Sequence, residues 1–216
     1  MKLVIQLLLW IIIVVLGYLV FNAVYEPIQF NKIKEKRYAK VIENLKDIRA
    51  AQMAHRQVTG RFEEDFDDLV SFLDTAQYTL TQRRDTTYLD EEYRRTYGVD
   101  REVEDVVIDT LGFASVKDSL FGNSDRFRTM MNVPIEGVDA QFEMDAGTVT
   151  KNESQIPVFE ARIAKSVVLH DLDRELVMQE EEIVGVDEVP GAFLSVGSMN
   201  EVKTSGNWPL RYGDNE

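Results

Sequence analysis

Cysteine is absent from this sequence of 216 residues, and histidine occurs only twice. The lack of cysteine excludes disulfide bonds, thiolate catalysis and cysteine-based metal sites. Glycine-rich phosphate loops and the G-x-S-x-G turn of serine hydrolases are missing as well. We therefore expect no catalytic residues, no cofactor and no bound metal.

Positive charge is also scarce, since 24 Lys and Arg residues stand against 38 Asp and Glu residues and the net charge is -14. Such an acidic surface repels phosphate backbones and anionic lipids, so we expect no nucleic-acid partner. The acidic clusters at residues 63–68 and at Glu180-Glu181-Glu182 are most simply interpreted as solvated surface.

The chain has instead one long apolar run from Leu3 to Val24, in which only Gln6 and Asn22 are clearly polar. As a helix, a run of this length covers the roughly 30 Å hydrocarbon core of a bilayer. A cleaved signal peptide has a shorter apolar stretch of about 7–15 residues. We therefore predict an uncleaved transmembrane anchor. The residues expected to contact lipid are Leu3, Trp10, Ile12, Leu16, Tyr18 and Phe21.

The charges around this run leave two orientations open. Lys2 precedes the run, whereas five Lys and Arg residues follow it between Lys32 and Lys40. The positive-inside rule then places the C-terminal domain in the cytoplasm, but long domains cross membranes largely regardless of their charge.

An amphipathic helix is predicted after the anchor. Pro27 lacks an N–H group and predicts a kink or short break just outside the bilayer. Apolar positions then recur at steps of three and four up to Thr59-Gly60, where glycine predicts the helix end. The residues expected on the core face are Tyr38, Val41, Leu45, Ile48, Gln52 and His55. A second, shorter helix is predicted over Glu63 to Leu73.

The remainder of the chain predicts an excursion and a sheet. Residues 76–102 are polar and rich in tyrosine, with a helical turn at Asp90 to Tyr97 inside an excursion or a partner-ordered loop. Beyond Val103, short segments alternate between apolar and polar residues, as in an antiparallel sheet covered on one side. The expected strands are 106–111, 127–135, 140–144, 158–164, 183–186 and 192–196, separated by turn residues.

These patterns together predict an α+β fold in which the amphipathic helix covers the antiparallel sheet. The predicted organisation is an anchor at 1–26, a spine helix with a short second helix at 27–75, the tyrosine-rich excursion at 76–102 and a mainly β region at 103–216. The turn at Ser205 to Pro209 is expected to pin Trp208 to the domain.

The order of these elements resembles the type IV pilins and the pseudopilins of type II secretion systems. The resemblance rests on the apolar helix, the segment from Ile48 to Phe62 with its Gly60-Arg61-Phe62 step, and the leucine-bearing helix that follows. It implies a spine helix on a small antiparallel sheet, and a bacterial inner-membrane protein with a periplasmic domain. The family also has a glutamate at the fifth position of its apolar segment, whereas Gln6 is the polar residue here. We therefore expect an assembly subunit more than a pilus subunit.

Two alternative sites for chemistry remain in the C-terminal half. His170 and Asp171 with Asp173 are the residue types of an acid–base or metal site, although their spacing matches no known motif. Oxygen ligands for calcium are also available at Asp171, Asp173, Asp214, Asn215 and Glu216.

Three functions are compatible with the sequence. The first is a non-catalytic, membrane-anchored envelope protein that acts as a structural or assembly subunit, with the bilayer and other membrane or envelope proteins, including a second copy, as partners. The second is a pilin-like filament subunit, and the third is a membrane-tethered ligand-binding or enzymatic domain that uses His170.

Overall fold

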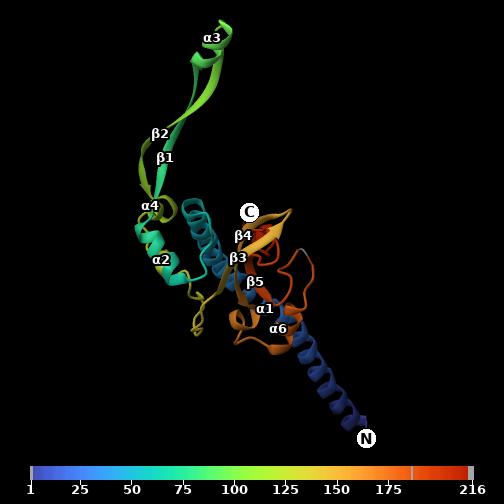
Figure 1. Cartoon of the computed structure of the whole chain (residues 1–216). Coiled ribbons are helices and arrows are strands. Elements are labelled where there is room, and N and C mark those ends of the chain that lie inside the picture. Colours follow the sequence, from blue (N-terminus) through green and yellow to red (C-terminus); the bar gives the residue numbers. More distant parts are fainter. Residues whose placement is uncertain (1, 186, 214–216) are drawn as a thin grey trace.

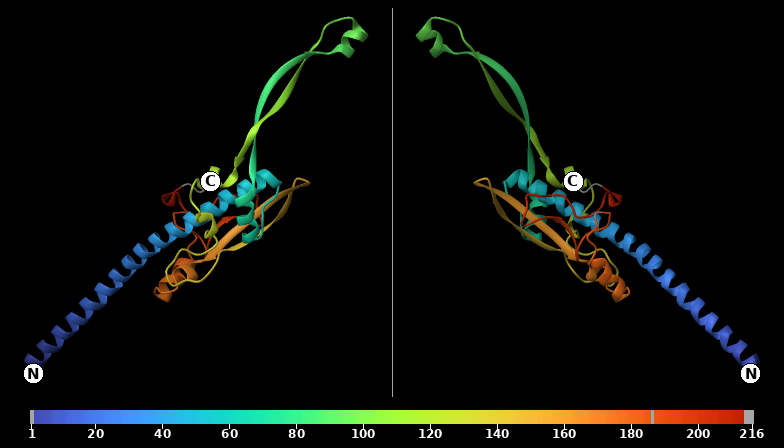
Figure 2. Two further views of the ribbon diagram at one scale, coloured as in Figure 1. Left: turned by 90° about the vertical axis from the view of Figure 1, so that its left-hand side faces the viewer. Right: turned by 90° about the vertical axis from the view of Figure 1, so that its right-hand side faces the viewer.

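A single helix forms the axis of the molecule. The computed structural model describes residues 2–185 and 187–213, and its first element is α1 (Lys2–Thr59), a helix of 58 residues. The N-terminal half of α1 projects away from the rest of the chain, whereas its C-terminal half lies within the folded domain (Figures 1 and 2).

The predicted break at Pro27 is wrong, because α1 continues through this residue. A proline removes one backbone hydrogen bond and crowds the preceding turn, which weakens a helix without always ending it. Here the strongly helical segments on both sides keep the backbone helical. The predicted end of the helix is confirmed, since Gly60 has a φ of +85° and its N–H donates to the carbonyl of Arg56 at 2.8 Å.

The short second helix is also confirmed, with a later start than predicted. It is α2 (Phe66–Thr75), and the Asp65 side chain caps it by accepting hydrogen bonds from the backbone N–H groups of Asp67 and Asp68. The acidic residues at its first turn suit the positive end of the helix dipole. Leu69 and Leu73 face the core and are fully buried.

A three-stranded antiparallel sheet packs against α1. Its strands are β3 (Glu143–Lys151), β4 (Ser154–Ala164) and β5 (Phe193–Gly197), in the order β3-β4-β5. The alternation predicted for β4 is present, because Phe159, Ala161 and Ile163 are buried and lie on one face of the strand. β4 and β5 both contact α1, so the helix covers this sheet. This confirms the α+β class with a long apolar N-terminal helix.

Two of the expected strands are wrong. Residues 127–135 hold a short 3-10 turn, η1 (Arg126–Arg128), and an irregular segment with one β-bridge at Asn132. The stretch contains the apolar residues Phe127, Met130 and Val133 because their side chains are part of the core, although the backbone there is an irregular loop. Residues 183–185 form no strand, and residue 186 lies outside the described part. The strand predicted at 140–144 begins only at Glu143.

Short helices complete the body. They are α4 (Val116–Phe121), α5 (Lys165–Val168) and α6 (Arg174–Glu181), followed near the C-terminus by the 3-10 turn η2 (Leu210–Tyr212). Trp208 is 1% exposed, as the turn at Ser205 to Pro209 predicts. Gly206 allows this packing, since a Cβ at that position would lie 2.3 Å from the indole ring.

The tyrosine-rich segment is ordered as a projecting arm. Strands β1 (Gln77–Leu89) and β2 (Glu102–Ser115) pair antiparallel, and α3 (Glu91–Tyr97) joins them at the tip. The helical turn at Asp90 to Tyr97 is thereby confirmed. The expected strand at 106–111 lies within β2, but it belongs to this separate two-stranded sheet and does not lie against α1. We call residues 77–115 the arm and the remaining chain beyond Pro27 the body.

Candidate functional site

The apolar half of α1 is the first surface with a functional meaning. The predicted anchor residues Leu3, Trp10, Ile12, Leu16, Tyr18 and Phe21 are all exposed, with between 48% and 78% of each residue accessible. Exposure of this apolar surface to water is unfavourable, because each Å² of apolar surface in contact with water costs about 25 cal/mol of free energy. Within the described residues, this one helix is long and apolar enough to cross a membrane.

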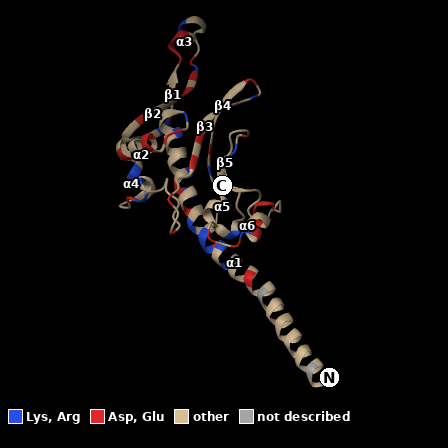
Figure 3. Cartoon of the chain, turned by 90° about the horizontal axis from the view of Figure 1, so that it is seen from below, with Lys and Arg blue, Asp and Glu red and all other residues tan. Residues whose placement is uncertain are grey.

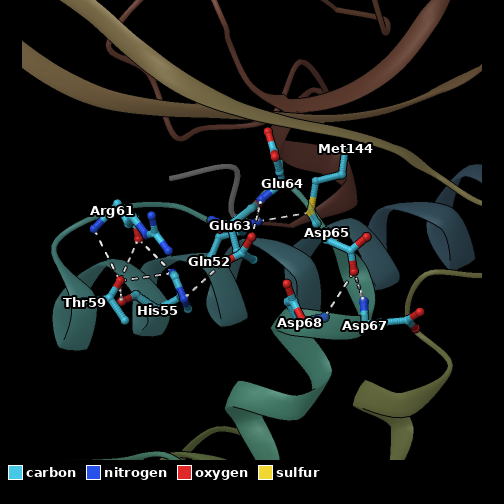
Figure 4. Close-up of polar contacts among 10 residues, drawn as sticks. All are labelled: Gln52, His55, Thr59, Arg61, Glu63, Glu64, Asp65, Asp67, Asp68 and Met144. Atoms are coloured by element: carbon cyan, nitrogen blue, oxygen red, sulfur yellow. Dashed lines mark hydrogen bonds and ion pairs between the residues drawn. The ribbon is translucent and has the colours of Figure 1, made fainter.

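The predicted core face of α1 lies in the body. Tyr38, Val41, Leu45 and Ile48 are fully buried, and Gln52 and His55 are buried beside them. Gln52 binds the segment between α1 and α2. Its side-chain amide donates to the Glu63 carbonyl at 2.6 Å and accepts from the Glu63 N–H at 2.9 Å. Figure 4 shows this contact.

His55 is held by similar contacts. Its Nδ1 lies 2.8 Å from the carbonyl oxygen of Arg61, which can only accept, so Nδ1 carries a proton (Figure 4). Its Nε2 lies 3.6 Å from the Glu63 carboxylate, and its ring packs edge-on against Phe72. These contacts join α1 to the segment before α2 and to α2 itself, and they identify His55 as a structural residue of the core.

A buried ionic cluster connects α1 to the C-terminal half of the body. Lys34 Nζ lies 2.8 Å from Glu180 Oε2, and Lys165 Nζ lies 3.3 Å from Glu180 Oε1. Lys165 is fully buried and also donates to the carbonyls of Glu180 at 2.6 Å and Val189 at 2.7 Å. Its ammonium therefore has a partner for each of its three hydrogens.

Burial dominates the electrostatics of this cluster. Desolvation lowers the pKa of Lys165, and the neighbouring Glu180 charge opposes that shift. Desolvation together with the same carboxylate raises the pKa of Tyr38, whose hydroxyl lies 3.3 Å from Glu180 Oε1. Every charged group in the cluster is matched by an opposite charge or a hydrogen bond, as a structural ion cluster requires. The interpretation of Glu180 as solvated surface was wrong, since this residue is 4% exposed.

Of the residues suggested for chemistry at 170–173, Asp171 and Asp173 have structural contacts, whereas His170 is exposed and lies 3.9 Å from the Asp171 carboxylate. Asp171 Oδ2 accepts from the Arg37 guanidinium at 2.8 Å, and this hydrogen bond lowers the pKa of Asp171 to about 2. Asp173 caps α6 by accepting from the N–H groups of Glu175 and Leu176. Across residues 2–185 and 187–213, no group of three His, Asp or Glu side chains is placed to hold a metal ion. The other calcium candidates, Asp214, Asn215 and Glu216, lie outside the described residues.

The Arg37–Asp171 pair gives a pH-dependent prediction. Because the pKa of Asp171 falls in the folded state, its contribution is complete above about pH 4, the ordinary aspartate range, and is lost as the pH falls towards 2. The Asp171 side chain is 49% exposed, so solvent limits the effect to less than about 1 kcal/mol. Asp171→Asn should therefore lower the free energy of unfolding at pH 6 and change it little at pH 2.

Urea denaturation at both pH values measures this difference. Asp139→Asn is the matched control, because Asp139 is exposed and makes no ion pair within the described residues. An equal loss for Asp171→Asn at pH 2 and pH 6 would contradict the proposed charge pairing.

A basic cleft lies where α1 enters the body. It has a volume of about 560 Å³ and lies between α1 and the segment 134–136. Its walls carry four cations, one carboxylate and a few apolar groups. The lining residues are Gln29, Lys32, Ile33, Lys36, Arg37, Lys40, Pro134, Ile135 and Glu136. Figure 3 shows Lys and Arg residues gathered on this stretch of α1, near α5 and α6. These residues belong to the positive segment between Lys32 and Lys40, which contrasts with the net charge of -14 of the whole chain.

The arm is another surface without cover from the body. Nearly all residues of β1 and most of β2 are exposed, and the arm leaves the body in the direction opposite to the apolar half of α1 (Figure 2). Ile108 and Phe113 are each 67% exposed. They lie opposite Arg83 and Thr79 in the strand register, so they share one face of the ribbon.

Comparisons with protein-family models, with curated proteins and with solved structures found no match. The resemblance of the spine to type IV pilins and pseudopilins therefore stays a prediction. The function of this chain has to be argued from its own surfaces.

Sequence reasoning missed Lys34 and Lys165 as members of the buried cluster. Lys34 continues the apolar stripe of α1, because it lies four residues before Tyr38 and four after the buried Phe30. Glu180 lies three residues after the buried Val177 on α6. Both spacings place a charged residue on a buried helix face, and together they are a signal for a buried ion pair.

Proposed function

We propose that this chain is a non-catalytic, single-pass membrane protein that acts as an assembly subunit and uses its arm to bind a partner. The observation that carries the proposal is the exposed arm, which extends away from the apolar helix (Figure 2). Strands of about 13 residues at about 3.3 Å each carry a binding surface roughly 40 Å from the body.

The arm has features that favour a partner. A two-stranded hairpin alone is marginally stable in water, and both of its edges offer unpaired N–H and C=O groups. Exposed Ile108, Leu111 and Phe113 add apolar area that a partner would cover. The tip is ordered by its own contacts, since Asp90 caps α3 and Arg101 stacks on Tyr93.

The charges on the two edges favour a second copy as the partner. β1 has a net charge of +1 from Arg83, Arg84 and Asp85, whereas β2 has a net charge of -4 from Glu102, Glu104, Asp105 and Asp109. The ion pairs Arg83–Asp85 and Arg84–Asp109 within the arm are exposed, and the other three carboxylates of β2 make no ion pair among the described residues. The β1 edge of one copy would therefore meet a complementary β2 edge of another, and strand addition of this kind gives main-chain hydrogen bonds. Another envelope protein with an exposed strand is the alternative partner.

The proposal of a non-catalytic role is supported by the buried polar groups. His55, Lys165 and Glu180 all make hydrogen bonds that join elements of the body. The location in a bacterial inner membrane with a periplasmic domain belongs to the same proposal, and it rests on the pilin-like order of elements. A reporter fused to the C-terminus would determine the orientation.

Shortening the arm tests this function. Residues 82–109 are replaced by Asn-Gly, which joins the paired residues Thr81 and Thr110 through a two-residue turn and leaves the body intact. The full chain, purified in mild detergent, should have a mass above that of a monomer, and the shortened chain should be a monomer with an unchanged unfolding temperature. Light scattering coupled to size-exclusion chromatography measures both masses.

A point variant provides a second test with a matched control. Ile108→Ser with Phe113→Ser removes the shared apolar face of the arm, and Val202→Ser with Leu210→Ser removes exposed apolar groups from the body. Only the arm variant should dissociate the assembly. A full chain that is strictly monomeric and has no copurifying partner would contradict the proposed function.

A further inference from the structure

The basic cleft has a composition that suits a ligand with both an anionic and an apolar part. Lys32, Lys36 and Lys40 supply positive charge, and Ile33 and Ile135 supply apolar surface in the same walls. Glu136 is the acidic residue of the lining, and it makes no ion pair with these lysines. Within residues 2–185 and 187–213, no carboxylate lies within 4.0 Å of the ammonium groups of Lys32, Lys36 or Lys40. These three exposed cations are therefore available to an incoming anion.

The fourth cation has a fixed position. Both terminal nitrogens of the Arg37 guanidinium contact Asp171, and one of them also donates to the Val168 carbonyl at 3.0 Å. Arg37 is thus held at the wall of the cleft by the segment that follows α5. Because Asp171 already compensates its charge, Arg37 shapes the wall of the cleft, and the three lysines supply the charge for an anion.

The cleft lies close to the expected membrane surface. Lys32 follows the last residue of the apolar run, Val24, by eight residues, or about 12 Å of helix. The headgroup layer beyond the hydrocarbon core is about 5–8 Å thick on each side. Lys32 is therefore within about one Debye length of the lipid phosphates at physiological salt, and Lys36 lies one helical turn further out.

We propose that the basic cleft binds the phosphate group of an anionic phospholipid at the surface of the membrane that holds α1. Positive clusters next to a membrane helix are attracted to anionic lipids by about 1 kcal/mol per Lys or Arg. Ile33 and Ile135 fit the apolar part of the same molecule. The acidic body is repelled by the same surface, so lipid binding at the cleft would orient the body and direct the arm away from the bilayer.

Native mass spectrometry of the full chain tests this site. The protein is purified in detergent and titrated with phosphatidylglycerol or with phosphatidylcholine of the same acyl chains. Lys32→Gln with Lys36→Gln removes two charges from the cleft. Lys151→Gln with Lys203→Gln is the matched control, because both residues are exposed and lie far along the chain from the cleft.

Phosphatidylglycerol should bind the wild type and the control variant more tightly than phosphatidylcholine does. The cleft variant should bind it about tenfold or more weakly, with an unchanged unfolding temperature. Equal losses in the cleft and control variants, or no preference for the anionic lipid, would overturn the proposal. If inorganic phosphate displaces phosphatidylglycerol when both are present at the same concentration, the ligand is a free phosphate. If the site binds an acidic protein and no lipid, the ligand is a protein partner. Either result would overturn the lipid assignment. The arm variants leave this readout unchanged.

Discussion

Glu180→Leu is expected to lower the free energy of unfolding by about 3–5 kcal/mol, because it removes one partner from a buried ion cluster. Lys165 would then remain in the core with no carboxylate in contact, and Lys34 would keep only Glu188, which lies 3.5 Å away and is partly exposed. Both lysines are buried in the body, so solvent cannot replace the carboxylate at low cost. Urea denaturation of the full chain in detergent, followed by circular dichroism, measures the loss.

Two further variants test the reason for this loss. Glu182→Leu makes the same substitution at an exposed residue two positions away and should change the free energy of unfolding by less than about 0.5 kcal/mol. A triple variant replaces all three charged residues of the cluster by apolar groups, through Lys34→Met, Lys165→Met and Glu180→Leu. This variant should recover most of the stability that Glu180→Leu alone loses. Similar losses for Glu180→Leu and Glu182→Leu would contradict a buried cluster.

Leu45→Asp is expected to destabilise the body by more than about 4 kcal/mol and to prevent its cooperative folding. Leu45 is fully buried at the centre of the core face of α1. Truncation of a buried leucine alone costs about 2–5 kcal/mol, and the aspartate adds the cost of burying a charge for which the apolar core offers no partner. Thermal unfolding, monitored by circular dichroism, measures the effect.

Met53→Asp is the control on the same helix, since Met53 is 41% exposed. This variant should unfold within a few degrees of the wild type. Unchanged stability in Leu45→Asp would mean that the core face of α1 is turned towards solvent or a partner, as in a coiled-coil stalk, and would contradict the packing of α1 on the sheet.

The helical part of the fold could be predicted because its pattern has one physical cause. The spacing from Tyr38 to His55 is set by a single buried face, and all six residues of that face are buried. The strand β4 was predictable for the same reason, since Phe159, Ala161 and Ile163 face the core. A periodic pattern of apolar residues identifies a helix or strand when one of its faces is buried and the other is in solvent.

Strand β1 of the arm could not be predicted because this condition fails there. Both of its faces are in solvent, so β1 shows no alternation between apolar and polar residues, and threonine and arginine occupy either face. The prediction for the loop around Phe127 was wrong for the opposite reason. Its apolar residues imitate a strand, although they enter the core from an irregular backbone.

The proposed function uses three separate surfaces of the molecule. The apolar half of α1 is the proposed anchor, the basic cleft lies next to the expected bilayer surface, and the arm extends in the opposite direction. The buried cluster around Glu180 and the core around Leu45 connect these surfaces by fixing α1 to the body. A rigid connection of this kind allows the anchor to determine where the arm is presented.

The most direct measurement of the proposed function is site-specific photo-crosslinking in intact cells. A photoreactive amino acid is placed at Ile108 on the arm or, as a control, at Val202 on the body, both of which are exposed. We expect illumination to give a discrete crosslinked product from position 108, most simply a dimer of this chain, and none from position 202. The absence of a product from position 108, or the same products from both positions, would contradict assembly through the arm.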